Sequence, residues 1–529
     1  MLTQTRPSQT ARRRHAGQGA PAQAPGDAAT AAEIRRFAFR QGPGRTVLNP
    51  PVEVENDAPT TAALAPHGAR GSLGHMLPAD TRAVLEALPY PAWPGRQSGG
   101  PAHLGHVLLA AFGLQRREPS NMFNDHRVVA SVRSKFPVHA FVVTGQGTAC
   151  YLDPYRQALV ELGRPAAPAE LLPPAGGVTV LLAPRYTDLP TGYARLRAAL
   201  TELETGVNLR ALFSAADLFG VTAQLRADGA ATHAAARLIQ AAGAGAWGAP
   251  VLVTLNPVTL PPHTQLPGAG DPPPDQDARL AEQAAHWSVR EAARIAGPAL
   301  AAGDEPAQPA HGLPVLASLD GRDGSGVSWA QVLWQRTAGR APKGVSGFTV
   351  LPCQVTERCV ADLAAFAAVP GPSGQLRRVA ERVRISVALQ HAGALPPGVS
   401  TLAGAQLRPV RSDPAVMTSI QRQFGYPLTP GGACGIRHAT AVWVLSADVN
   451  AVIADLGPGG WALLQRWCGW AAHGICTASA AHGLFARPAR SFDEYALHAV
   501  LGLPDSEVPV FIVVCGRTQF AEPAWDLRT

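Results

Sequence analysis

Two stretches of similar sequence decide the fold: residues 206–220 read GVNLRALFSAADLFG, and residues 469–483 read GWAAHGICTASAAHG. Each stretch is rich in small residues and carries a glycine at both ends. Small and apolar residues in a run of this length predict two equivalent, buried helices.

The similarity continues outward from both stretches in the same order. Each is preceded by a strand-like run that starts 28 residues upstream, and each is followed by a strand-like run that begins with proline. Farther upstream, both copies have a strand, a glycine-containing turn and a second extended stretch. The paired segments are VTVLLAPRYT (178–187) with AVWVLSADVN (441–450), PVLVTLNP (from Pro250) with PVFIVVCG (from Pro509), and FPVHAFVVTGQGTACYLDP (136–154) with VRISVALQHAGALPPGVSTL (383–402). These matches predict a duplicated unit.

The composition is that of a large globular protein and excludes several classes. Of the 529 residues, 46% are hydrophobic and 16% are charged. No apolar run approaches the roughly 18 residues of a membrane helix, and none follows the basic N-terminus, so we expect a cytoplasmic protein without a membrane partner. The net charge of +7 is spread along the chain, which argues against a nucleic-acid partner. The seven cysteines lack paired short spacings, so neither a disulfide framework nor a metal site is expected.

Changes in composition divide the chain into five parts. They are a disordered tail (1–30), an N-terminal extension (31–94), the first copy (95–255), a proline-rich linker (256–315) and the second copy (316–529). Within the extension we expect a short helix near Ala79–Leu88, and within the linker one helix over about Asp277–Ala296.

Three further segments carry candidate functional residues. The second copy opens with Arg336-Thr337-Ala338-Gly339-Arg340, and its last strand runs into Arg517. The first copy contains RVVASVRSKFP (127–137) and APRYTDLPTGYARLRAALTELETGVNLRALFSAADLFGV (183–221). Arginine forks beside a hydroxyl donor suit a dianionic phosphate.

With these repeats and motifs, the chain resembles the flavin-dependent nitroreductase fold over about residues 95–255 and 325–520. More narrowly, it resembles azoline dehydrogenases of the SagB/McbC type, in the two-copy form that accompanies thiopeptide-type biosynthetic clusters. The resemblance implies an α+β fold of two tandem nitroreductase-like domains, each an antiparallel or mixed sheet wrapped by helices. The two domains are expected to form an intramolecular pseudo-dimer with one composite flavin site at their interface.

The resemblance implies FMN as the cofactor and assigns residues of both copies to it. The second copy would hold the phosphate, while the first would supply a loop and the catalytic pair. In that loop, Ser131 and Pro137 match the family's pattern, whereas Ala130 and Arg133 depart from it. The candidate FMN-binding residues are Arg336, Thr337, Arg340, Arg517, Ser131, Arg133, Asn208, Gly483, Leu484 and Arg487.

The catalytic candidates are Tyr186, Arg185 and Glu204. Arg185 stands where the family has lysine, and arginine does not give up its proton. Tyr186 is therefore the candidate base, with a pKa lowered by the charge of Arg185, and Glu204 is a fallback base. Structural alternatives stay open, because Tyr186 could serve only to end a strand and Glu204 only to pair with an arginine.

The implied activity is oxidation of thiazolines or oxazolines to thiazoles or oxazoles in a ribosomally made peptide. A precursor peptide bearing azolines would be the substrate, a cyclodehydratase or leader-binding protein the partner, and molecular oxygen the electron acceptor. The chain would act as a monomeric pseudo-dimer or a higher homo-oligomer. Two other functions stay open: a non-catalytic peptide-binding or scaffold subunit that kept the fold, and a nicotinamide-dependent nitro- or ene-reductase.

Overall fold

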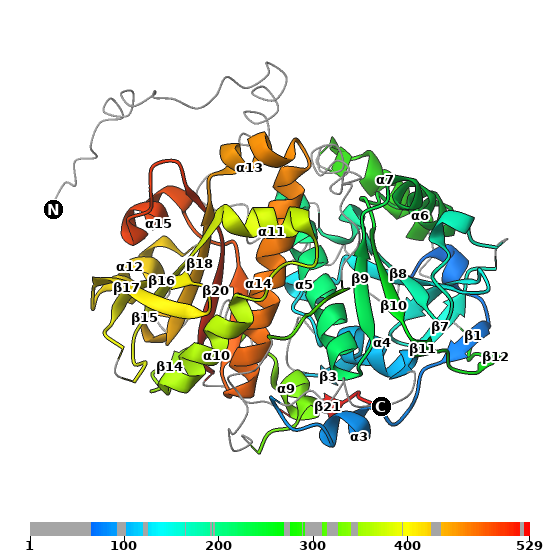
Figure 1. Cartoon of the computed structure of the whole chain (residues 1–529), viewed down its shortest axis with the longest axis horizontal. Coiled ribbons are helices and arrows are strands. Elements are labelled where there is room, and N and C mark those ends of the chain that lie inside the picture. Colours follow the sequence, from blue (N-terminus) through cyan, green and yellow to red (C-terminus); the bar gives the residue numbers. More distant parts are fainter. Residues whose placement is uncertain are drawn as a thin grey trace.

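The computed structural model describes residues 65–91, 102–119, 125–163, 166–190, 193, 196–268, 276–287, 289–290, 309–314, 326–339, 348–393, 395–424, 435–518 and 523–529. These residues form two large antiparallel sheets on either side of two long central helices (Figure 1). The expected α+β class with two tandem domains is confirmed. The expected tail, together with Arg340, lies outside the described residues.

The first sheet has the strand order β12-β1-β7-β6-β5-β8-β10-β9-β13. Its central strands β5 and β8 are runs of mostly valine, leucine and alanine whose residues are all buried, as is typical of strands covered on both faces. The strands are β1 (Leu73–Met76), β5 (Val138–Thr144), β6 (Ala149–Asp153), β7 (Ala158–Glu161), β8 (Val178–Pro184), β9 (Thr222–Arg226), β10 (Val251–Asn256), β12 (His263–Gln265) and β13 (Pro309–Ala310).

The second sheet has the order β14-β20-β18-β15-β16-β17, and β19 also pairs with β20. Its strands are β14 (Val350–Leu351), β15 (Val383–Leu389), β16 (Gly398–Ala403), β17 (Gln406–Ser412), β18 (Ala441–Ala447), β19 (Phe485–Ala489) and β20 (Val508–Thr518). The path β17-β16-β15-β18-β20-β19 repeats the path β7-β6-β5-β8-β10-β9 of the first sheet. Strands β8 and β18, and likewise β9 and β19, start 263 residues apart, which is also the spacing of the two glycine-bounded stretches.

The central helices α5 (Leu196–Leu218) and α14 (Gly460–Ala481) contain the two glycine-bounded stretches and pack against each other (Figure 1). A Cβ on Gly206 would lie 1.8 Å from the carbonyl oxygen of Arg466, and a Cβ on Gly469 would lie 1.9 Å from that of Leu203. The two contacts are equivalent, because Gly469 lies 263 residues after Gly206 and Arg466 lies 263 residues after Leu203. The same patch therefore meets itself, as at a two-fold dimer interface.

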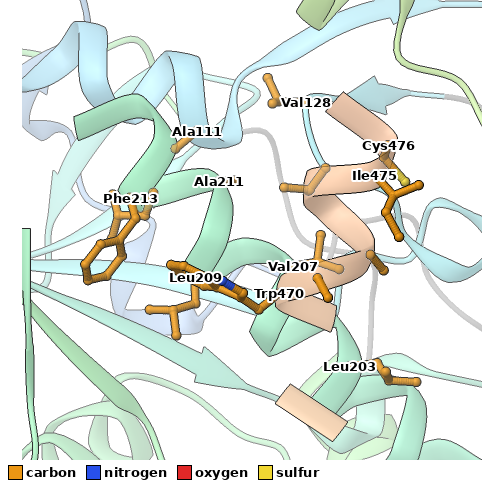
Figure 2. Close-up of a cluster of buried hydrophobic side chains, with 14 of the residues drawn as sticks. Ala111, Val128, Leu203, Val207, Leu209, Ala211, Phe213, Trp470, Ile475 and Cys476 are labelled. Atoms are coloured by element: carbon orange, nitrogen blue, oxygen red, sulfur yellow. The ribbon is translucent and has the colours of Figure 1, made fainter. Parts of the chain in front are cut away.

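Much of the interface around this crossing is apolar. Figure 2 shows side chains of both helices, among them Val207, Trp470, Ile475 and Cys476, together with Val128 of the first domain. They belong to one continuous buried cluster that includes residues of both domains.

Of the remaining helices, α6 covers the outer face of the first sheet and α12 and α15 cover that of the second, whereas α4, α9, α10, α11 and α13 pack against the central helices (Figure 1). Several begin at a side chain that accepts a hydrogen bond from a first-turn amide, such as Asp228, Ser328 and Ser373. They are α3 (Thr81–Glu86), α4 (Leu104–Phe112), α6 (Gly229–Ala242), α7 (Gln276–Ala285), α9 (Trp329–Gln335), α10 (Glu357–Ala367), α11 (Gly374–Glu381), α12 (Val416–Gln423), α13 (Val449–Leu456) and α15 (Glu494–Leu501). Helix α3 lies where the sequence predicts a short helix, and α7 covers the first half of the helix expected over about Asp277–Ala296, whose end lies outside the described residues.

Segments outside the two repeats enlarge the first domain, and one of them joins it to the C-terminal end of the chain. Strands β1 and β12 extend the first sheet beyond β7. Near the C-terminus, β21 (Trp525–Asp526) pairs with β3 (Leu114–Arg117) of the first domain, which in turn pairs with β4 (His126–Arg127). A short parallel pair joins β2 (Ala102–His103) to β11 (Val258–Thr259).

The helix crossing gives a stability prediction. We expect Gly206→Ala to cost about 3 kcal/mol of unfolding free energy, because the added methyl group meets a backbone oxygen that cannot rotate away. Urea unfolding measures the change. Gly145→Ala is the control, since a Cβ at that exposed turn has nothing within 4 Å. Equal midpoints for the two variants would contradict the close crossing.

Candidate active site

A stripe of buried polar residues runs along helix α5. Arg197, Thr201, Glu204 and Asn208 lie within about 60° of one another around the helix axis, and each is at most 6% exposed. We call these four residues the polar face of α5. The residues 263 positions later on α14 are Gly460, Leu464, Trp467 and Ala471. The two copies thus differ at this face, which is polar in the first domain and apolar in the second.

Glu204 is the central group of the polar face. Its Oε1 accepts a hydrogen bond of 2.7 Å from the Val132 backbone N–H, and the Ser131 hydroxyl also faces the carboxyl. Its buried Oε2 has no hydrogen-bond partner. Burial raises the pKa of Glu204 to about 8, against the opposing effect of these hydrogen bonds. A carboxyl group with such a pKa can accept and release a proton near neutral pH.

The segment that faces Glu204 is the loop Ser131–Phe136. Arg133, Ser134 and Phe136 have φ values of +50°, +54° and +49°, a region that side chains other than glycine seldom adopt. The Ser131 hydroxyl accepts a 2.7 Å hydrogen bond from the Phe136 N–H and so closes the loop. The Arg133 guanidinium lies 5.6 Å from the centre of the Tyr193 ring.

Tyr186 and Arg185 lie outside the polar face, in two different buried networks. The Tyr186 hydroxyl donates to Glu202 Oε1, while Glu202 Oε2 accepts a 2.6 Å hydrogen bond from Arg466 Nε on α14. Burial, followed by the charge of Glu202, raises the pKa of Tyr186 well above its usual value. The expectation of a lowered pKa was wrong, because Tyr186 faces a carboxylate and Arg185 is paired elsewhere.

The partner of Arg185 is Asp188. Arg185 Nε donates to Asp188 Oδ1 at 2.6 Å, and His139 Nε2 lies 2.6 Å from Asp188 Oδ2. The Tyr151 hydroxyl lies 3.1 Å from His139 Nδ1 and extends the network into strand β6. Burial, followed by the charge of Arg185, lowers the pKa of His139 to about 4, so this imidazole is neutral at physiological pH.

Arg336 of the second domain reaches the first domain directly. Its guanidinium donates a 3.0 Å hydrogen bond to the Arg127 carbonyl, four residues before Ser131. Arg116 donates in turn to the carbonyl oxygens of Trp334 and Arg336. Burial and then the charge of Arg116 lower the pKa of Arg336 to about 10. Nε of Arg127 and Nε of Arg336 are both buried without a hydrogen-bond partner.

The residues after Arg336 run beside strand β19. The Ala486 N–H donates to the Thr337 carbonyl at 3.0 Å, and Arg487 Nε donates to the Ala338 carbonyl at 2.9 Å. Exposed Arg517 follows Gly516, whose register partner on β19 is Phe485. Leu484 is buried, and Gly483 is exposed with a φ of +67°. Thr337 and Arg487 thus lie along strand β19, and Arg517 lies near the C-terminal end of the neighbouring strand β20, where it pairs with Leu351 of β14.

The structure brings together part of the predicted site. Arg336 meets the segment that leads into Ser131, and Ser131 meets Glu204. Asn208 donates to the Glu204 carbonyl at 2.7 Å and, with Arg127 and Phe136, lines a cavity of about 20 Å³, which is room for one water. Sequence reasoning missed Arg127, Arg197 and Asp188. The seven-residue spacing of Arg197 and Glu204 in a buried helix was the available signal.

The described ranges hold neither a metal centre nor a membrane helix. They contain no group of three or more His, Cys, Asp or Glu side chains that could hold a metal ion. No helix among them is long and apolar enough to cross a membrane.

Comparison with known proteins shows the fold. No protein-family model matches the chain, and no curated protein matches it. A solved structure described as a nitroreductase from Anabaena variabilis is similar over 78% of this chain and 87% of its own, with a TM-score of 0.52 and 16% identity. The chain therefore has a nitroreductase fold, in an arrangement that extends over both domains.

Shorter similarities cover about one domain. The Escherichia coli microcin synthetase McbBCD complex with truncated pro-MccB17 bound matches 35% of this chain and 71% of its own, with a TM-score of 0.27 and 13% identity. The oxidoreductase YcnD of Bacillus subtilis matches 36% of this chain and 67% of its own, with a TM-score of 0.24 and 17% identity.

The raised pKa of Glu204 predicts how stability depends on pH. Unfolding returns the carboxyl to a pKa near 4.5. Between pH 4.5 and 8 the folded chain therefore binds one proton more than the unfolded chain, and it loses stability as the pH rises. We expect Glu204→Gln to gain stability relative to the unchanged chain over this range, by up to about 1.4 kcal/mol per pH unit. Urea unfolding at several pH values measures the difference. Glu381→Gln, at an exposed position on α11, is the control. A difference that does not change with pH would contradict a buried, protonated Glu204.

Proposed function

We propose that this chain is an FMN-dependent oxidoreductase that dehydrogenates thiazoline or oxazoline rings in a peptide. The observation that carries the proposal is Glu204, a buried carboxyl with an unpaired Oε2 and a pKa near 8 beside the Ser131 loop. Arg336 of the other domain contacts the backbone that leads into that loop. The fold similarity and the sequence motifs support an oxidoreductase of the flavin type.

The described residues fit the phosphate of FMN. Arg127 and Arg336 each have a buried Nε without a partner, and an anionic group would satisfy such donors. Thr337 follows Arg336 in the chain, Arg487 donates to the Ala338 carbonyl, and exposed Arg517 adds a positive charge near the end of β20. We assign the phosphate to this group of residues and the flavin ring to the side of Ser131 and Asn208.

The proposed chemistry removes a proton and a hydride from the azoline ring. FMN, when bound, supplies the two-electron acceptor. Glu204 Oε2 takes the more acidic ring proton, while Val132 N–H holds Oε1 and, with the Ser131 hydroxyl beside the carboxyl, fixes its orientation. The burial of the polar face excludes water from the reacting atoms. Molecular oxygen is the proposed final electron acceptor, with hydrogen peroxide as its product.

The proposal assigns Tyr186 a positioning role. Its hydroxyl holds Glu202, which pairs with Arg466 across the domain interface. Tyr186 thereby fixes α5, and with it Glu204, relative to the second domain. The substrate is proposed to be a precursor peptide, presented by a cyclodehydratase or leader-binding partner.

The competing function is a peptide-binding subunit that kept the fold without its chemistry. The observation in its favour is the Arg185-Tyr186 pair, which is completely buried and forms hydrogen bonds to other side chains of the protein. Such a subunit would bind the same peptide and contain no pigment.

The visible spectrum of the purified chain tests the cofactor. We expect flavin absorbance, and FMN as the pigment released by acid. Arg336→Lys keeps the charge but loses the planar fork, so FMN affinity should fall about 10-fold or more. Arg422→Lys, at an exposed position on α12, is the control and should stay fully coloured. A colourless chain that takes up no added FMN would leave only the peptide-binding function.

Turnover of an azoline-bearing peptide in air, without nicotinamide, tests the reaction. We expect the rate to rise with pH up to about 8, where Glu204 becomes deprotonated, and Glu204→Gln to lower kcat by about 10²-fold or more with that pH dependence lost. Tyr186→Phe should keep the pH profile, because it alters only the positioning network. A requirement for nicotinamide would identify a nitro- or ene-reductase instead.

A further inference from the structure

Arg197 is a buried cation without a hydrogen-bond partner. It is the second residue of α5, its side chain is 0% exposed, and none of its three guanidinium nitrogens is bonded. Asp188 is close enough to counteract the lowering of the pKa of Arg197, which burial brings to about 10. Both oxygens of Asp188 are already bonded, one to Arg185 and the other to His139.

This position is costly for a positive charge on two grounds. A buried guanidinium without partners loses its hydration and gains no hydrogen bond in return. The first turn of a 23-residue helix also carries the positive end of the helix dipole, which disfavours a cation there. Helical side chains lean toward the N-terminus, so the guanidinium and the first-turn amides face the same region. An anion at this point would relieve both costs.

Two comparisons within the chain distinguish Arg197 from an arginine that serves the fold. The corresponding residue at the start of α14 is Gly460, so the fold itself does not require a cation at this place. Arg210, also on α5 and also completely buried, has two unbonded nitrogens, but its third donates to the Phe366 carbonyl at 3.1 Å and its guanidinium lies 4.7 Å from the centre of the Trp470 ring. A buried arginine that only stabilises the fold has partners such as these.

We propose that Arg197 and the first turn of α5 bind an oxyanion, a carboxylate or a phosphate, carried by the ligand that occupies the polar face. Arg197 and Glu204 are seven residues apart, about 10 Å along the helix, so one small ligand can span both. Arg197 is shielded from solvent, and entry therefore requires local opening at the start of α5. The proposal does not depend on a flavin and would survive a colourless chain.

Thermal unfolding of the full chain tests the site with simple ions. The additions are sodium acetate, sodium phosphate and the neutral analogue acetamide, with sodium chloride keeping the ionic strength constant. We expect acetate or phosphate to raise the Tm by about 2 °C or more in a saturable way, and acetamide to have no effect. A larger effect of acetate would indicate a carboxylate ligand, and a larger effect of phosphate would indicate a phosphorylated one. No saturable effect of either anion would overturn the proposal.

Arg197→Met and Arg210→Met form a matched pair on the same helix. Without added anion, we expect Arg197→Met to have an equal or higher Tm, because it removes an unpaired buried charge, and Arg210→Met to have a lower one. The anion response should vanish in Arg197→Met, weaken in Arg197→Lys and persist in Arg210→Met. A loss of stability in Arg197→Met as large as that in Arg210→Met, or an unchanged anion response, would overturn the proposal.

Discussion

The close approach of helices α5 and α14 is the contact on which the rest of the structure depends. Gly206 and Gly469 let each backbone lie against the other, and only residues without a Cβ fit there. The Glu202–Arg466 ion pair, completely buried beside this crossing, ties the two helices together electrostatically. Every residue proposed for the site lies on α5, on a loop that packs against it, or on a segment of the second domain that this crossing brings near.

The two copies share a fold and differ in chemistry. Their strand orders are the same, and the glycine contact of each copy has its equivalent 263 residues away in the other. Yet the α5 face with Arg197 and Glu204 corresponds to an α14 face of glycine, leucine, tryptophan and alanine. A duplicated chain can keep one copy for chemistry and use the other as its support, because the crossing needs only small residues at its centre. This difference supports the proposal of one composite site in place of two.

The fold was predictable from the sequence to a large extent, whereas the site was predictable only in part. The glycine-bounded helices and the strands around them repeat in order, so residue type and spacing are enough to pair residues 206–220 with 469–483. Glu204, Ser131 and Arg336 were identified through motifs. The raised pKa of Tyr186 was not, because burial raises it first and Glu202 and Arg466 act on it next, and Arg466 lies 280 residues away in the chain.

The sequence by itself determined the duplication, the α+β class and the positions of small residues where two backbones meet. These properties are local or periodic, so the order of residue types along the chain encodes them. The tertiary structure alone decided which charges meet. It placed Glu202 against Tyr186 and Arg466, left Oε2 of Glu204 unpaired, and enclosed Arg197 without a partner. The physical reason is that pKa values and hydrogen bonds are set by burial and by neighbours in space, and a residue distant in the chain supplies both.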